Sequence, residues 1–178
     1  ISTITVTEPS SLIATATSTA ALCNGSSTGT VTVSVNGGTA PYTGTGTFTG
    51  LAAGTYSYTV TDANGCTSTV NVSVSQPTPV LASATAGTIL CNGSTTTVTV
   101  TGNGGIAPYS GTGLFTVVAG NYSYTVTDIN GCTSTTNISI AQPTPLTGNA
   151  STTPVLCFGG STGTVTITRS EEHTSELQ

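Results

Sequence analysis

The chain has 178 residues, of which one is Lys or Arg and six are Asp or Glu, and its formal net charge at pH 7 is −5. Arg169 and the single histidine, His173, lie in the last ten residues, so residues 1–168 carry no Lys, Arg or His. This composition argues against nucleic-acid binding, which needs basic side chains to displace phosphate counterions. It also argues against electrostatic docking to a membrane. No apolar run approaches the roughly 20 residues that span a bilayer, so we expect no membrane span in this sequence.

The chain is built from repeats. GTYSYTVTDANGCTST (54–69) recurs as GNYSYTVTDINGCTST (120–135), and SQPTP (75–79) recurs as AQPTP (141–145). Self-similarity at a spacing of about 66 residues indicates tandem domains. In chain order we predict the last strand of a preceding repeat (1–10), a complete repeat (11–77), a second complete repeat (78–143), the truncated start of the next repeat (144–168) and a tail (169–178). Because the chain begins with Ile1 rather than Met, we expect both ends to be truncations.

Each repeat shows the pattern of antiparallel strands. Apolar residues alternate with Thr and Ser, which is typical of half-buried strands. The expected inner faces are Val31, Val33 and Val35, then Tyr56, Tyr58 and Val60, then Val70, Val72 and Val74, with Val98, Val100, Tyr122, Tyr124, Val126, Ile138 and Ile140 in the second repeat. Asn64-Gly65 and Asn130-Gly131 predict hairpin turns. Tyr56, two residues after Gly54, resembles a tyrosine corner. We therefore predict an all-β fold of tandem, small, immunoglobulin-like antiparallel β-sandwich repeats.

The five cysteines follow the repeat. Each complete repeat has two, so we predict disulfides between Cys23 and Cys66 and between Cys91 and Cys132. Cys157 is then left unpaired, because its repeat is truncated. A domain of about 66 residues is marginally stable without such a bridge. Disulfides in turn indicate an oxidising, extracytoplasmic location.

The residues needed for catalysis are missing. Each repeat has at most one carboxylate in its body, Asp62 or Asp128, and no histidine or lysine. Acid–base catalysis requires titratable groups within reach of one another, and a cysteine nucleophile requires a base. Zinc sites would need ligands at a closer spacing than these cysteines have. We predict that the chain is not an enzyme and needs no cofactor.

Two patterns allow a second interpretation. The sequence D-x-N-G (Asp62 and Asn64, Asp128 and Asn130) resembles the opening of a calcium loop, but the later oxygen ligands of such a loop are absent. A hairpin turn stabilised by the Asp side chain is the favoured interpretation, and no metal site is predicted. Thr-x-Thr steps occur in proteins that bind ice or polysaccharide, but Thr is also suited to the solvent face of an uncharged sheet.

The tail differs from everything that precedes it. RSEEHTSELQ (169–178) is charged and lies outside the repeat. One choice of codons for these ten residues gives a sequence that resembles a widely used short-read sequencing adapter. We therefore predict that residues 169–178 are adapter read-through, and no function is inferred from them.

The combined motif of the repeats resembles a known family. The segments CNGSSTGTVTV, GGTAPY and LAAGTYSYTVTDANGCTST, and their counterparts in the second repeat, are similar to the SprB repeat of very large surface proteins in gliding bacteria. The resemblance implies a structural or adhesive segment of a secreted cell-surface protein, an adhesin stalk or binding array, exported by type IX secretion. Surface polysaccharide or other cell-surface proteins are the implied partners. Two alternatives stay open: a glycan- or calcium-binding module, and spacer repeats in a large secreted enzyme.

Overall fold

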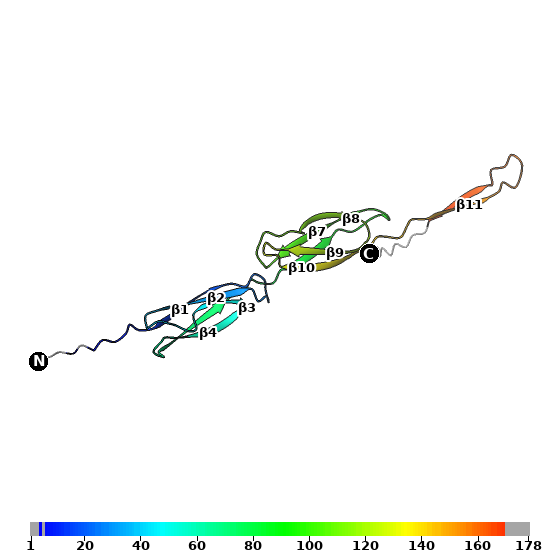
Figure 1. Ribbon diagram of the computed structural model, residues 1–178. Helices are drawn as coiled ribbons and strands as arrows, with labels where there is room; N and C mark the ends of the chain where they lie inside the picture. The colour runs from blue at the N-terminus through cyan, green and yellow to red at the C-terminus, as the bar shows by residue number, and fades with distance from the viewer. Residues whose placement is uncertain (1–3, 5, 170–178) are drawn as a thin grey trace, which may run out of the picture. The chain divides into compact units, whose positions relative to one another are not determined.

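The computed structural model of the protein describes residue 4 and residues 6–169. These residues form strands, turns and irregular segments, with no helix among them, which confirms the predicted all-β fold (Figure 1). The predicted adapter-derived segment lies outside the described residues, except for Arg169, which ends the last strand. Residues 4 and 6–10, in the segment predicted as the strand of a preceding repeat, belong to no strand.

Twelve strands are described. The first five are β1 (Ile13–Thr19), β2 (Gly29–Asn36), β3 (Gly46–Leu51), β4 (Gly54–Thr61) and β5 (Thr67–Val74). The next five are β6 (Leu81–Ala86), β7 (Thr96–Asn103), β8 (Gly113–Val117), β9 (Gly120–Thr127) and β10 (Thr133–Ile140). The last two are β11 (Gly148–Thr153) and β12 (Thr164–Arg169). Strands of similar length thus recur in the same order, as the sequence repeat predicts.

The chain divides into two compact units. One contains the described residues of Ile1–Ser83, Thr101–Thr112 and Tyr124–Thr136. The other contains those of Ala84–Val100, Gly113–Ser123 and Asn137–Gln178. The first unit therefore holds β1–β5 together with the loops and the hairpin turn at the N-terminal end of the second repeat.

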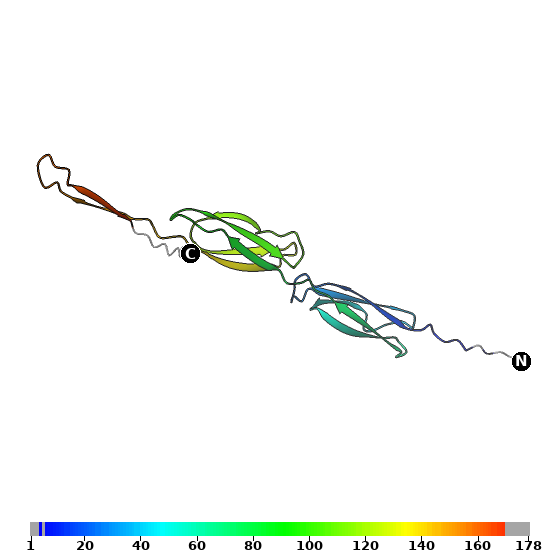
Figure 2. The ribbon, with the colours of Figure 1, turned by 180° about the vertical axis from the view of Figure 1, so that it is seen from behind.

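Strands β1–β5 form a small sandwich. One sheet has the order β1-β2-β3, the other is the β4–β5 hairpin, and all the neighbours are antiparallel. The core between them consists of four buried valines, Val31, Val33, Val60 and Val74, with tyrosine and phenylalanine side chains packed around it. A hydrogen bond from the backbone N–H of Ala14 to Ser68 Oγ (3.0 Å) joins β1 to β5. The strands run lengthwise and the loops gather at the two ends of the sandwich (Figures 1 and 2).

The period-2 pattern is confirmed on both faces of these strands. Val31 and Val60 are fully buried, whereas the Thr side chains between the apolar residues pair across the strands on the outer faces. Thr32 bonds Thr47 (3.1 Å) and Thr59 bonds Thr69 (3.0 Å) through their hydroxyl groups. Cross-strand Thr pairs are a recognised source of sheet stability. Many of the Thr-x-Thr steps are thus engaged in the sheets.

The second set of strands has the same sheet orders, β6-β7-β8 and β10-β9. Its most buried side chains are Val98, Val100 and Val126, on the predicted inner faces. The expected tyrosine corner is present in both sets. Tyr56 Oη donates to the carbonyl of Ala52 (2.8 Å), and Tyr122 Oη donates to that of Val118 (3.1 Å). Strands β11 and β12 pair as β1 and β2 do, and all their residues are exposed.

Candidate functional site

The connection between the two complete repeats is held by hydrogen bonds and by a disulfide. Strand β5 ends at Val74 and β6 begins at Leu81, so the recurring segment SQPTP (75–79), called the joint below, lies between them. Proline fixes its own φ and restricts the residue before it, which stiffens this segment. The carbonyls of Ser75, Pro77 and Thr78 and the side chain of Gln76 are bonded by residues of the two repeats.

On the first side, the turn at residues 21–28, called the Cys23 turn, holds the joint. Asn24 Nδ2 donates to the carbonyl of Pro77 (3.0 Å), and the N–H of Gly25 donates to Oε1 of Gln76 (2.7 Å). The N–H of Ala21 also donates to the carbonyl of Ser75 (2.8 Å). Since Pro77 has no N–H of its own, its carbonyl is the group available for anchoring.

On the second side, the loop after β7 holds the joint. The N–H of Gly105 donates to the carbonyl of Thr78 (3.0 Å). Gly104 has a φ of +69°, and a Cβ atom there would lie 2.0 Å from the carbonyl oxygen of Pro79. Only glycine combines this backbone conformation with so close an approach of another backbone segment. The Asn-Gly-Gly sequence at the end of β7 therefore holds the joint from the side of the second repeat.

The hairpin turn between β9 and β10, residues 128–132, is organised by a buried carboxylate. Asp128 is 5% exposed, and its Oδ1 accepts the N–H groups of Asn130 and Cys132, both at 2.9 Å. Its Oδ2 accepts the N–H of Ile106 (3.0 Å), and this bond connects the turn to the loop after β7 that holds the joint. Burial raises the pKa of this carboxyl. The hydrogen bonds from backbone N–H groups lower the pKa by more than burial raises it, so the net pKa lies below its ordinary value of 3.8.

A disulfide closes this arrangement. Cys23 is bonded to Cys132, with their Cα atoms 5.6 Å apart, and the bridge joins the Cys23 turn of the first repeat to the hairpin turn of the second. Beside it, Asn130 Nδ2 donates to the carbonyl of Leu22 (3.2 Å). The predicted pairings of Cys23 with Cys66 and of Cys91 with Cys132 are therefore wrong. Cys66, Cys91 and Cys157 are free and exposed.

The length of one strand explains why a bridge within a repeat does not form. Cys66 immediately precedes β5, and the Cys23 turn is bonded to residues 75–77, just after β5. The two cysteines thus lie at opposite ends of an eight-residue strand, which is about 26 Å long at 3.3 Å per residue. A disulfide requires Cα atoms within about 7 Å. The cysteine that Cys23 can reach is the one at the near end of the next repeat.

The weak metal candidates have a structural role. Asp62 in the first repeat is 6% exposed and accepts the N–H groups of Thr39, Asn64 and Cys66 at 2.9–3.0 Å. Burial raises its pKa, and these hydrogen bonds lower it to a net value below 3.8. The Asn64 side chain donates to Thr39 Oγ1 (3.1 Å). Both D-x-N-G sequences thus form the Asp-stabilised turn, and the described residues contain no group of three or more His, Cys, Asp or Glu side chains placed to hold a metal.

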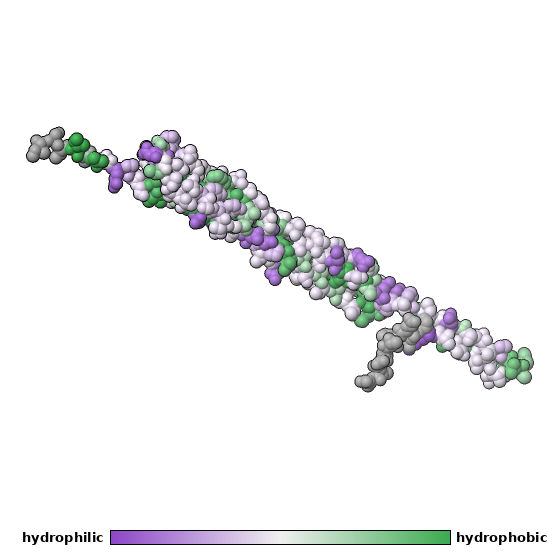
Figure 3. Space-filling view, turned by 90° about the horizontal axis from the view of Figure 1, so that it is seen from below, coloured by the Kyte–Doolittle hydropathy of each residue, from purple (hydrophilic) through white to green (hydrophobic). Residues whose placement is uncertain are grey.

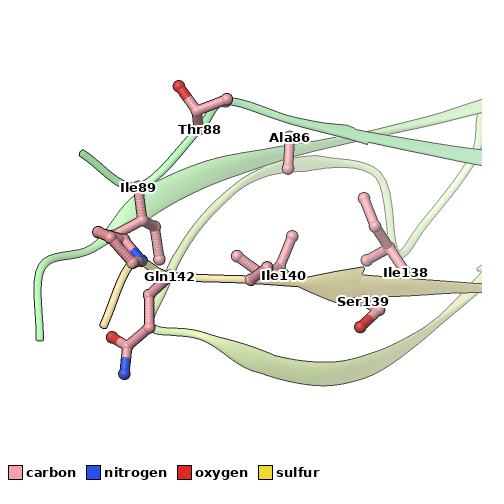
Figure 4. A pocket seen from close by; sticks show the side chains of 10 residues that line it. Ala86, Thr88, Ile89, Ile138, Ser139, Ile140 and Gln142 are labelled. Carbon is pink, nitrogen blue, oxygen red and sulfur yellow. The ribbon is translucent and has the colours of Figure 1, made fainter. Parts of the chain in front are cut away.

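A hollow lies at the C-terminal end of the second repeat. It has a volume of about 490 Å³ and is lined by residues before and within the turn at Cys91 and by the end of β10 (Figure 4). Ile89, Ile138 and Ile140 supply apolar walls, and Gln142 lies at its rim. No titratable side chain lines it, so it offers shape and hydrogen bonds but no acid–base chemistry.

Comparison with protein families identifies the repeat. Residues 15–43 and 149–170 match the family model of the SprB repeat. Two segments of the chain thus match the SprB repeat. The first match covers most of β1, the Cys23 turn and β2, and the second covers their counterparts around Cys157. No curated protein and no solved structure matches the chain.

The SprB match sets the broad class of the protein. SprB repeats are structural repeats of cell-surface proteins, not an enzyme family. Together with the disulfide, the match indicates an extracellular, adhesin-type repeat region. Among the described residues, no helix has both the length and the apolar character required to cross a membrane.

Several residues of the joint were missed by the sequence analysis. No role was predicted for Asn24, Gln76 or Gly104, although each makes or permits a contact that holds the joint. The available signal was the recurrence of Cys-Asn-Gly (23–25 and 91–93) together with Gln-Pro (76–77 and 142–143), at the similar separations of 53 and 51 residues.

Proposed function

We propose that this chain is an adhesive, load-bearing segment of a large exported bacterial surface protein. The observation that carries the proposal is the covalent bridge across the joint between the two complete repeats, the first of which matches the SprB repeat over residues 15–43. A bridge within a repeat would stabilise a domain, whereas a bridge between repeats transmits force from one domain to the next. Such a connection suits a protein that is pulled while it is attached to a surface.

The surface chemistry supports contact with neutral polymers. The view in Figure 3 is dominated by weakly polar residues, with few strongly hydrophilic ones. Residues 1–168 have only three charged side chains, and two of these, Asp62 and Asp128, are buried. Hydroxyl and amide groups can hydrogen-bond sugar hydroxyls without the desolvation penalty of charged groups. Surface polysaccharide is therefore the first partner that we propose, and uncharged regions of other surface proteins are the second.

A bead assay tests the adhesive role. Beads carrying the complete chain are allowed to settle on agarose and on bare glass, and the fraction retained under flow is measured against beads that carry serum albumin. The proposal expects retention on agarose that is several-fold above the albumin control and that rises with the density of chains on the bead. Retention equal to the control on agarose and on a lawn of intact cells would contradict adhesion and would favour the alternative of spacer repeats.

Export by the type IX pathway in a gliding bacterium is the second part of the proposal, and it follows from the family resemblance. The measurement is surface labelling of the protein in cells with and without the type IX machinery. Labelling that is lost with the machinery supports this route. Undiminished labelling in its absence would rule the route out.

A further inference from the structure

Each half of the bridged joint occurs a second time in this chain. The joint at residues 75–79 has a C-terminal half-site from the first repeat, which presents Cys23, and an N-terminal half-site from the second repeat, which presents Cys132. The second repeat also has a C-terminal half-site, and the first repeat also has an N-terminal one. These two additional half-sites present Cys91 and Cys66.

The C-terminal half-site of the second repeat matches that of the first. Asn92 Nδ2 donates to the carbonyl of Pro143 (2.9 Å), as Asn24 does to Pro77 (3.0 Å). The N–H of Gly93 donates to Gln142 Oε1 (2.9 Å), as Gly25 does to Gln76 (2.7 Å). The turn that displays Cys91 is thus fixed on its own linker in the same way as the Cys23 turn.

The N-terminal half-site of the first repeat matches that of the second. The N–H of Gly38 donates to the carbonyl of Ser10 (2.9 Å), as Gly105 does to Thr78 (3.0 Å). The hairpin turn that displays Cys66 is built on Asp62, whose Oδ1 accepts the Cys66 N–H at 2.9 Å, the same distance as between Asp128 and Cys132.

Exposure shows that the additional half-sites are uncovered. Leu22, beside the bonded Cys23, is 52% exposed, whereas its counterpart Leu90, beside Cys91, is 84% exposed. Cys66 and Cys91 are themselves exposed, whereas Cys23 and Cys132 are partly buried. Both thiols thus lie in turns with the same hydrogen bonds as the bonded pair, and no half-site covers them in the described residues.

We infer that SprB repeats of this type are linked by one disulfide per joint, in which the first cysteine of each repeat bonds the second cysteine of the repeat that follows. Cys91 then takes the second cysteine of a following repeat, and Cys66 takes the first cysteine of a preceding one. Cys157, the third residue at the Cys23 position, has the same role as Cys91. This inference rests on the joint geometry and is independent of what the surface binds.

The chemistry is thiol–disulfide exchange with a small disulfide oxidant. The thiolate of one cysteine attacks the oxidant and releases one reduced thiol, which leaves a mixed disulfide. The thiolate of the second cysteine then displaces the other half of the oxidant. Two protein thiols lose two protons and two electrons, and one oxidant disulfide becomes two thiols.

The test is the complete chain with residues 78–143 duplicated in tandem after Pro143, so that the QPTP joint is preserved. The protein is refolded with oxidised and reduced glutathione, its free thiols are alkylated, and it is then unfolded and cleaved before each aspartate. We expect two separate cross-linked pairs of peptides, one containing Cys23 and Cys132, the other containing Cys91 and the copy's Cys132. Cys91 should disappear from the alkylated fraction.

The Cys23–Cys132 bond in the same sample reports that the duplicated chain has folded. With that bond present, an alkylated Cys91, or a Cys91 bonded to Cys132 of its own repeat in any fraction, would overturn the inference. As a matched control, Cys132→Ser in the copy should return Cys91 to the alkylated fraction. Failure of this test would leave the bead assay unaffected, and failure of the bead assay would leave this linkage unaffected.

Discussion

Gly104 shows how one residue fixes the joint. It has a φ of +69°, and a side chain there would run into the carbonyl oxygen of Pro79. Gly65 has a similar φ of +81°, but a Cβ atom there would meet nothing within 4 Å. A side chain at Gly65 would therefore cost only the strain of a left-handed backbone, whereas a side chain at Gly104 would also collide with the joint.

We expect Gly65→Ala to cost about 1–2 kcal/mol, the ordinary penalty of this conformation for an L-residue. Gly104→Ala should cost more, because the joint must also move away from the new Cβ atom. Denaturant unfolding of the two variants and the parent measures the difference. Equal losses would show that Pro79 does not pack against Gly104.

The two buried aspartates predict how stability depends on pH. Their folded-state pKa values lie below 3.8, because backbone N–H donors outweigh the opposing effect of burial. A lowered folded pKa means that the stabilisation is fully present above the unfolded value and is lost as the pH falls through the folded value. The melting temperature should therefore be nearly constant from about pH 5 to 7. It should decrease as the pH is lowered further, past 3.8.

The variant with both Asp62→Asn and Asp128→Asn should melt at a lower temperature than the parent at pH 7, since an amide NH2 in place of Oδ2 cannot accept the N–H of Thr39 or of Ile106. It should also show a smaller change in melting temperature between pH 5 and pH 2. Thermal melts across this range provide the measurement. An acid dependence as steep as that of the parent would assign the pH effect to other groups.

At the scale of the elements, the sequence predicted what local periodicity determines. Alternating Val and Tyr residues identified β2, β4 and β5 and the buried faces of Val31 and Val60, because the alternation of a strand is read directly from spacing. The Asn-Gly turns and the tyrosine corner of Tyr56 were also predicted, because each depends on a few residues that are adjacent in the sequence.

The disulfide was predicted wrongly because pairing depends on which end of the sandwich each turn occupies. Counting two cysteines per repeat suggests a pair, but Cys23 and Cys66 are separated by the length of β5. The contact of the Cys23 turn with the joint decides the partner, and that contact is not visible in any single repeat. The number of cysteines per repeat does not tell at which end of the sandwich each cysteine-bearing turn lies, and that information decides the pairing.

Removing the bridge should destabilise the chain, while removing the exposed thiols should not. The bridge closes a loop with a sequence separation of 109, for which the chain-entropy estimate is about 4.7 kcal/mol, with smaller values usual in practice. We expect a clear loss of stability for the variant with both Cys23→Ser and Cys132→Ser, and none for Cys66→Ser or Cys91→Ser. Chemical denaturation under non-reducing conditions compares them. Destabilisation by Cys66→Ser of the same size would contradict the assignment.

At the scale of the whole molecule, the bridge removes a long segment of chain from extension. When the chain is pulled by its ends, the segment between Cys23 and Cys132 lies inside a covalent loop. Because a residue contributes at most about 3.3–3.6 Å of extended length, a separation of 109 corresponds to about 360–390 Å. Single-molecule stretching should show this much additional length after reduction. A gain of only about 140–155 Å would match a bridge from Cys23 to Cys66 instead.

The most direct test of the account is the disulfide map of the oxidised chain. The two aspartates at 62 and 128 divide the sequence into peptides 1–61, 62–127 and 128–178, and no other aspartate is present. After alkylation of free thiols, unfolding and cleavage before aspartate without reduction, mass spectrometry should find peptide 1–61 joined to peptide 128–178. Peptide 62–127, which contains Cys66 and Cys91, should be found alone with two alkylated thiols. Peptide 1–61 joined to peptide 62–127 would show that the repeats are bridged internally, and the cross-repeat joint would be refuted.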